Sequence, residues 1–231
     1  MEKQQDNKKS KKPRKKLRLA IVFSLWLLVG FLAFKLLMDK PASYNPEDIK
    51  NDKCVSQYVT NELAPYVYNN IQKGQSFEII IPQSKTKEFI SLIEWPIESE
   101  DVTISSPQAF FVDNGLVMRA NAETKGLNFV ITIMISGLID ETGMLHLNLD
   151  KIMIGSMNTT LIAKIIAKKM YQYRAKQENY SKDTIGTDIA ASLFDNRPFD
   201  PVFEVRQRKV RVKQINVEKS QLKITLAPAI D

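Results

Sequence analysis

Residues 19–38 form an apolar run long enough to cross a membrane, and this run constrains the fold more than any other feature. Only Ser24, Gly30 and Lys35 interrupt it. Twenty helical residues rise about 30 Å, the thickness of a bilayer's hydrocarbon core. Thirteen of them are Leu, Ile, Val or Phe, together worth about −4 to −8 kcal/mol on insertion. Lys35 opposes this by at most about 3 kcal/mol. The balance predicts a transmembrane helix.

The run is predicted to stay attached as a signal anchor. A cleaved signal peptide has a shorter apolar region and a cleavage site with small residues. Here the run ends in KLLMDKP, which offers no such site. The single cysteine, Cys54, cannot form an internal disulfide, and a domain without disulfides is compatible with either redox compartment.

The net charge of +7 belongs to the N-terminal tail. Residues 1–18 hold nine basic and two acidic side chains, and the remainder holds 24 of each. The neutral remainder lacks the basic footprint of a nucleic-acid-binding domain. The positive-inside rule predicts a cytoplasmic tail, with everything after residue 38 in the periplasm or at the cell surface.

The chain is therefore divided into four segments. They are a basic cytoplasmic tail (1–18), a transmembrane anchor (19–38), a juxtamembrane helical stalk (39–74) and an extracytoplasmic α+β domain (75–231). Helical spacing in the stalk covers residues 46–72, and Pro65 should kink or end that helix. The helix either acts as a stalk or lies against the domain.

Alternating apolar residues predict long antiparallel strands in the outer domain. Residues 77–81 form a strand and residues 84–95 a helix. Residues 108–155 contain two hairpins, whose turns carry Asn114-Gly115 and Gly143. A third hairpin closes the chain, and its alternation slips near Lys209, which suggests a bulge. Period-two strands have one buried face, and long strands twist. We expect a long, strongly curved antiparallel sheet wrapped around one or two helices.

Two helices are expected after the second hairpin, over residues 157–176 and 187–196. The first has an apolar stripe, which we expect to close the apolar face of the sheet, and no acidic residue. Its basic side is either the solvated face of a core helix or a contact with anionic lipid headgroups. The stripe consists of Leu161, Ile162, Ile165, Ile166 and Tyr173.

Catalytic chemistry has few candidate residues. The single histidine, His146, shares a strand face with Asn148 and Asp150, and a solvated sheet surface explains the three. One histidine and one distant cysteine do not have metal-ligand spacing. No nucleotide-binding, hydrolase or metalloprotease motif occurs. We therefore expect no enzyme activity, cofactor or metal.

The order of the predicted elements and their local sequences resemble those of a known group of proteins. FEIIIPQSKTKEFISLI is followed by DNGLVMRANA, GMLHLNLDKIMIG, NTTLIAKIIAKKM and VRVKQINVEKSQLKITL, over roughly residues 75–228. This pattern resembles membrane-anchored bacterial envelope proteins of the YpmS and LmeA kind, which are similar to the tubular lipid-binding (TULIP-like) superfamily. The resemblance implies a curved sheet around a helix, with an apolar groove for lipid tails.

The sequence thus predicts a membrane-anchored envelope protein that binds or shields an apolar ligand, lipid above all. The alternative is a non-catalytic module that docks a protein partner in the envelope. The candidate groove residues are Leu116, Met118, Phe129, Ile131, Ile133, Leu147, Leu149, Ile162 and Ile166. The candidate lipid-headgroup residues are Lys164, Lys168, Arg206, Arg208 and Arg211, although an edge strand also uses such side chains against aggregation.

Overall fold

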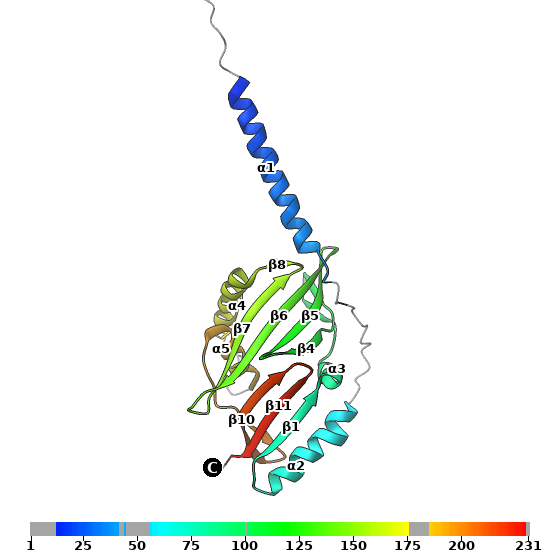
Figure 1. The fold of residues 1–231 in the computed structure, drawn as a ribbon, viewed down its shortest axis with the longest axis vertical. Helices are drawn as coiled ribbons and strands as arrows, with labels where there is room; N and C mark the ends of the chain where they lie inside the picture. The colour runs from blue at the N-terminus through cyan, green and yellow to red at the C-terminus, as the bar shows by residue number, and fades with distance from the viewer. Residues whose placement is uncertain (1–12, 42–43, 45–55, 100, 176–184, 230–231) are drawn as a thin grey trace, which may run out of the picture.

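The computed structural model describes residues 13–41, 44, 56–99, 101–175 and 185–229. A long helix, α1 (Pro13–Met38), projects from one end of an α+β domain that contains two antiparallel sheets (Figure 1). The α+β class and the antiparallel strands predicted from the sequence are confirmed. The first part of the helix expected over 46–72 lies outside the described residues.

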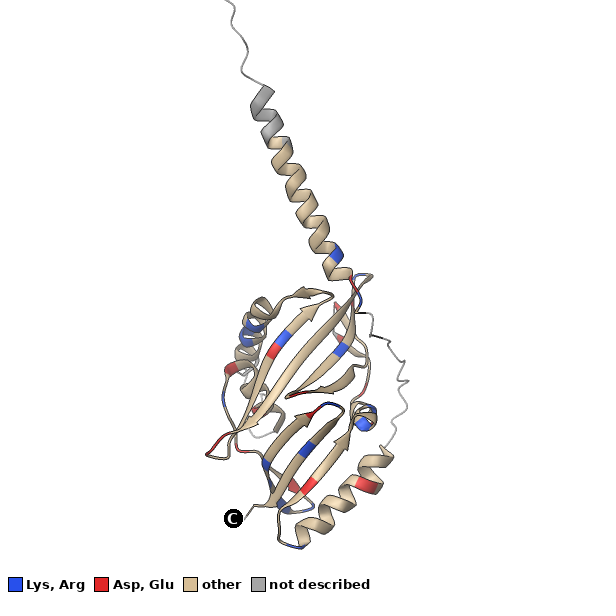
Figure 2. Ribbon diagram, viewed as in Figure 1, with Lys and Arg blue, Asp and Glu red and all other residues tan. Residues whose placement is uncertain are grey.

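Helix α1 is long and apolar enough to cross a membrane. Its most apolar window, Ile21–Met38, has a mean hydropathy of 2.3, and none of the window is buried in the protein. Figure 2 shows this window without charged residues except for one basic band near its end, and Lys35 is the basic residue in the last turn of α1. An isolated helix of this composition has no protein surface on which to bury its side chains, whereas lipid would cover all of them.

The larger sheet has seven strands in the order β2-β3-β5-β6-β7-β8, with β4 paired to β5. Its strands are β2 (Ile97–Ser99), β3 (Val102–Ile104), β4 (Gln108–Val112), β5 (Gly115–Thr124), β6 (Leu127–Ile139), β7 (Leu145–Ile154) and β8 (Met157–Asn158). Both predicted hairpins of residues 108–155 are present. The first turn consists of Asp113 and Asn114, and Asn114 takes a φ of 63°, which asparagine tolerates better than most residues; Gly115 already belongs to β5 and pairs with Val112.

A bulge in β7 preserves the apolar face of this sheet. Ile135 pairs with Leu149 and Met134 with Lys151, so Asp150 has no cross-strand partner. The extra residue shifts the alternation by one, and Ile152 therefore faces the same side as Leu149.

The smaller sheet has four strands in the order β1-β11-β10-β9. They are β1 (Phe77–Pro82), β9 (Val202–Val205), β10 (Arg208–Glu218) and β11 (Gln221–Pro228). The break in apolar alternation that suggested a bulge near Lys209 comes from a tight turn between β9 and β10. Arg206 and Gln207 both take positive φ in this turn. The bulge itself lies further on, between Val212 and Gln214.

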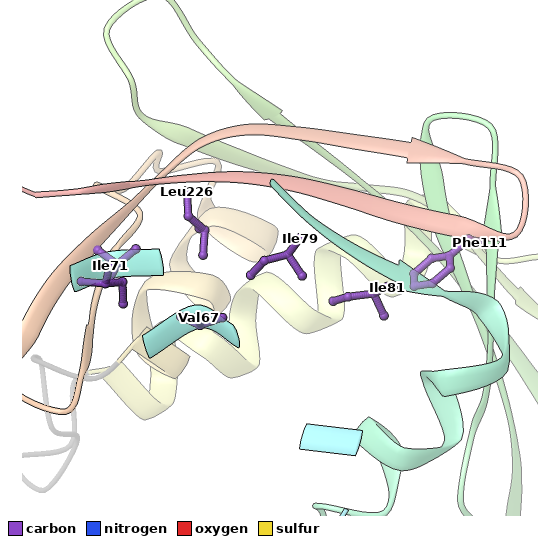
Figure 3. Packing of buried hydrophobic residues seen from close by; sticks show 7 residues of the cluster. Val67, Ile71, Ile79, Ile81, Phe111 and Leu226 are labelled. Carbon is purple, nitrogen blue, oxygen red and sulfur yellow. The ribbon is translucent and has the colours of Figure 1, made fainter. Parts of the chain in front are cut away.

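Helix α2 (Ala64–Gln72) covers the smaller sheet. Val67 and Ile71 of α2 pack with Ile79 of β1 and Leu226 of β11 in the buried core (Figure 3). A π-helical segment, Tyr58–Leu63, leads directly into α2, and proline stands in the first turn of α2, where it needs no backbone hydrogen bond. This part of the expected stalk lies against the domain.

Two helices cover the free edge of β7. Ser192 of α5 (Ile185–Asp195) accepts a hydrogen bond from the Leu147 amide at 2.8 Å. Thr160, which begins α4 (Thr160–Ala175), accepts one from the Ile152 amide at 2.9 Å. These bonds satisfy backbone groups that a bare edge would expose. The expectation that α4 closes the apolar face of the sheet is therefore wrong, since α4 lies along the sheet edge.

The end of α1 docks on the turn between β7 and β8. The Ser156 amide donates to the Leu36 carbonyl at 2.9 Å, and the Ser156 hydroxyl donates to the Asp39 carboxylate. Gly155 has a φ of 59°, and a Cβ at this position would collide with the carbonyl oxygens of Leu36 and Leu37. Only glycine therefore allows this close approach of two backbones.

We expect Gly155→Ala to separate α1 from the domain. The measurement is the yield of a disulfide between cysteines placed at Asp39 and Ser156, in a chain with Cys54 changed to Ser, after mild oxidation in membranes. Gly126→Ala is the matched control, because Gly126 also has positive φ, 76°, but a Cβ added there would meet no atom within 4 Å. The yield should fall with Gly155→Ala and hold with Gly126→Ala; an equal yield in both would contradict the docking.

Candidate functional site

An apolar pocket of about 580 Å³ lies where the two sheets meet beneath the short helix α3 (Thr86–Ile90). Strands β4, β5 and β6 form its floor, and α3 with the segment after it forms its cover. Thr86 is the only polar residue of the wall other than Trp95, whose indole is bonded. The wall consists of Ile81, Thr86, Phe89, Ile90, Ile93, Trp95, Ile104, Pro107, Ala109, Phe111, Leu116, Met118, Ala120, Ile131, Ile133 and Leu222.

Gln83 fixes the cover to the floor. Its side-chain oxygen accepts from the Phe111 amide at 2.6 Å, and its side-chain amide donates to the Ala109 carbonyl. One side chain thus satisfies the edge of β4 as another strand would. The Thr86 hydroxyl donates to the Gln83 carbonyl at 2.8 Å, which holds the first residue of α3 in the same network. The polar atom of the wall is therefore already bonded.

Glu88 ties the outer side of α3 to the helical segment before α2. Its carboxylate accepts from the Ser56 hydroxyl and the Tyr58 amide, both at 2.8 Å, and from the Lys85 ammonium at 3.0 Å. The Lys85 hydrogen bond, with those from Tyr58 and Ser56, lowers the pKa of the Glu88 carboxyl. Because a helix N-terminus carries unpaired amides and a positive end, a carboxylate suits this position.

Trp95 and Ile93 complete the cover of the pocket. The Trp95 indole donates to the Ile90 carbonyl at 2.9 Å, and its ring is buried. Ile93 lines the pocket but is 55% exposed, so it lies where the pocket meets solvent. An apolar side chain in this place would be covered by an apolar ligand.

One end of the pocket lies close to the docked end of α1. In the sheet register, Ala120 of β5 pairs with Ile131 of β6, and Ile131 pairs with Ile154 of β7. The next residue, Gly155, contacts α1. Strands are about 4.8 Å apart, so the pocket begins about 5 to 10 Å from that contact. The pocket is therefore next to the point where the chain would leave a membrane.

Four of the nine candidate groove residues line this pocket: Leu116, Met118, Ile131 and Ile133. Among the others, Leu149 is buried outside the pocket wall, and Phe129 and Leu147 are half-buried. Ile162 and Ile166 are exposed on α4. The sequence pattern identified the sheet face because alternation is a local signal.

The pocket's cover was missed as part of the site. Phe89 and Ile93 lie four residues apart within the helix expected over 84–95, and this helical spacing could have assigned them to the cover. The helix is shorter than expected, because α3 ends at Ile90 and turns follow it. Pro107 carries no local signal. Leu222 alternates with Ile224 and Leu226 in the last strand, but only tertiary packing brings it to the pocket.

The five candidate headgroup residues do not form one surface. Arg206 lies over the Tyr68 ring of α2, 4.9 Å from its centroid, at the end of the domain far from α1 (Figure 1). Arg208 follows it in the same hairpin and is exposed. Arg211 forms a two-point ion pair with Asp200, at 2.7 and 2.8 Å.

The other two candidates, Lys164 and Lys168, are both exposed on α4. Lys168 pairs with Asp195 of α5 at 3.1 Å, and this pairing lowers the pKa of the Asp195 carboxyl.

His146 pairs with Asp140 at the base of the β6–β7 turn, at 2.7 Å. Asp140 also accepts hydrogen bonds from the Thr142 hydroxyl and amide and from the Met144 amide, and these bonds, with that from His146, lower the pKa of its carboxyl. Such a network shapes a turn. Within the described residues, no group of three or more His, Cys, Asp or Glu could hold a metal ion.

Comparison with protein-family models, with curated proteins and with solved structures found no significant match to this chain.

We expect Glu88→Gln to loosen the cover of the pocket and lower the melting temperature. Because the folded-state pKa of Glu88 is lowered, its stabilising effect is present above the unfolded pKa of about 4.3 and is lost as pH falls through the folded pKa. The difference in melting temperature between the two proteins should therefore be larger at pH 7 than at pH 3. Tryptophan fluorescence measures it, since Trp95 packs against α3. Glu94→Gln, at an exposed position just after α3, is the control; a pH-independent difference would refute the assigned role of Glu88.

Proposed function

We propose that this chain is a membrane-anchored protein whose outer domain shields an apolar ligand, a lipid tail, in the pocket under α3. The observation that carries the proposal is the pocket itself, an apolar space of about 580 Å³ whose few polar atoms are bonded internally. Ligand pockets in proteins usually enclose about 300 to 1,000 Å³. Nothing in this wall would recognise a polar group, so the ligand portion held here is hydrocarbon.

The energetics favour a role between membrane and water. Removing a methylene group from water is worth about 0.8 kcal/mol, so enclosing about ten of them gains about 8 kcal/mol. A tail that leaves a bilayer for the pocket gains little, because both surroundings are apolar. The pocket would therefore act by keeping a tail out of water after it leaves the bilayer. Its closeness to the end of α1 supports this role.

The proposal includes the topology and the family inferred from the sequence. The basic tail 1–18 would lie in the cytoplasm and the domain in the periplasm or at the cell surface. Kinship with YpmS- and LmeA-like, TULIP-like envelope proteins would account for an anchored lipid-binding domain. A long, strongly curved sheet wrapped around a helix stays a prediction of that resemblance. The absence of catalysis likewise stays a prediction.

A photoreactive phospholipid tests the proposal in the full chain. The protein is placed in nanodiscs that contain a phosphatidylcholine with a diazirine on its acyl chain, and labelled peptides are identified after illumination. We expect adducts on pocket peptides from β5, β6 and the segment after α3. Labelling of α1 serves as the internal reference in every sample. Labelling of α1 without any pocket peptide would overturn the proposal.

We expect Ala120→Phe to lower pocket labelling about tenfold, because overfilling a packed site costs about 1 to 3 kcal/mol. Ala120 lines the pocket, whereas Val117 of the same strand alternates to the opposite face. Val117→Phe is therefore the matched control and should label as the parent protein does. If the two variants label alike, the adducts do not come from the pocket. In that case, cross-linking in intact membranes would test the alternative, a module that docks an envelope protein.

A further inference from the structure

Helix α4 presents its large apolar side chains away from the domain. Ala163, Ala167 and Tyr171, spaced by four residues, are half-buried and face the domain, and the Tyr171 ring lies 6.4 Å from that of Phe194 in α5. Contiguous exposed apolar patches usually mark an interaction surface. The exposed residues are Leu161 (80%), Ile162 (66%), Ile165 (58%), Ile166 (52%), Met170 (55%) and Tyr173 (69%).

The charges of α4 fit an anionic partner. The helix contains no acidic residue, and Lys164, Lys168 and Lys169 are all exposed. Figure 2 shows these basic bands on the helix. In a helical projection Lys164 and Lys168 lie along one side of the apolar face and Lys169 lies within it. A long lysine stem can pass along apolar surface to place its ammonium among headgroups. An apolar face combined with lysines and no acids is typical of helices that lie in a membrane interface.

The position of α4 brings it to the membrane that α1 crosses. Its first residue, Thr160, follows Ser156 by four residues, and the Ser156 amide is bonded to the Leu36 carbonyl at 2.9 Å. Figure 1 places α4 beside β7 and β8, in the half of the domain nearest α1. The end of α1 and the first turns of α4 are thus held at one end of the domain.

We propose that α4 lies in the headgroup region of the leaflet from which α1 emerges, with its Leu and Ile side chains among the acyl chains and with Lys164 and Lys169 on anionic lipid phosphates, while Lys168 stays paired with Asp195. This inference does not depend on a lipid in the pocket. Two attachments, α1 and α4, would hold the domain in one orientation on the bilayer.

The depth of α4 can be measured in the full chain. A single cysteine replaces Ile165 in a protein with Cys54→Ser, carries an environment-sensitive NBD fluorophore, and is placed at one copy per nanodisc of phosphatidylcholine and phosphatidylglycerol. We expect strong NBD emission, quenching by a nitroxide on the lipid acyl chain and protection from aqueous iodide. The matched control is Glu141→Cys, in the exposed β6–β7 turn. Because β7 has ten residues, this turn lies about 30 Å from Gly155 and should stay open to iodide.

Each outcome of this experiment decides the proposal. Lipid quenching with one copy per disc supports it and excludes a second copy as the occupant. Equal iodide access at positions 165 and 141 overturns it, and so does protection that appears only in native membranes, which would indicate a protein partner. The variant Lys164→Gln with Lys169→Gln should weaken insertion in the anionic discs but not in pure phosphatidylcholine. Circular dichroism verifies that each labelled protein is folded, and an equal effect of the lysine variant in both lipids overturns the headgroup contact.

Discussion

The apolar face of the seven-stranded sheet must be covered, and the way in which it is covered determines the rest of the domain. Helix α3 has only five residues, so it cannot fill the space over several strands. It is nevertheless fixed in place, since Gln83 bonds it to β4 and Glu88 bonds it to the helical segment before α2. A short, rigid cover over a wide apolar floor leaves a pocket. If the cover were loose, the hydrophobic effect would draw it down and close the space.

A second constraint is the contact between the end of α1 and the domain. The backbone of Leu36 and Leu37 approaches Gly155 so closely that no side chain could be present there. This contact places the β7–β8 turn, the near end of the pocket and the start of α4 at the same end of the molecule. The turn, the pocket and the helix differ in kind, but all three lie near the end of α1. Under the proposed function, the apolar pocket and the outward apolar face of α4 would both lie beside a bilayer.

The sequence predicted the strands well where the signal is local. The hairpins of residues 108–155 follow from alternation and from turn residues such as Asn114-Gly115, because both are properties of neighbouring residues. The sequence-based prediction was wrong where a single residue changes the alternation of a strand. Asp150 interrupts the alternation of β7, and Arg206 takes a left-handed conformation that a non-glycine residue seldom adopts. From the sequence, Asp150 was assigned to a polar strand face with His146, and the turn at Arg206 was interpreted as a bulge near Lys209.

The sequence predicted the floor of the candidate site but not its cover. Its floor includes Leu116, Met118, Ile131 and Ile133, which the strand pattern identified. Its cover depends on Gln83, whose role is invisible in the sequence because a glutamine after a strand is ordinarily a surface residue. Ile162 and Ile166 were expected to close the site, yet they face outward.

By itself, the sequence determined the apolar helix over residues 19–38, the location of the net charge, the strand faces and the existence of an apolar stripe on residues 157–176. These are matters of composition and period, which each segment carries alone. Only the tertiary structure decided which way that stripe points. Ala163 and Ala167 face the domain, because α4 lies along the edge of β7, whose amide of Ile152 bonds to Thr160. A helical period shows that a face exists, but what packs against it depends on residues elsewhere in the chain.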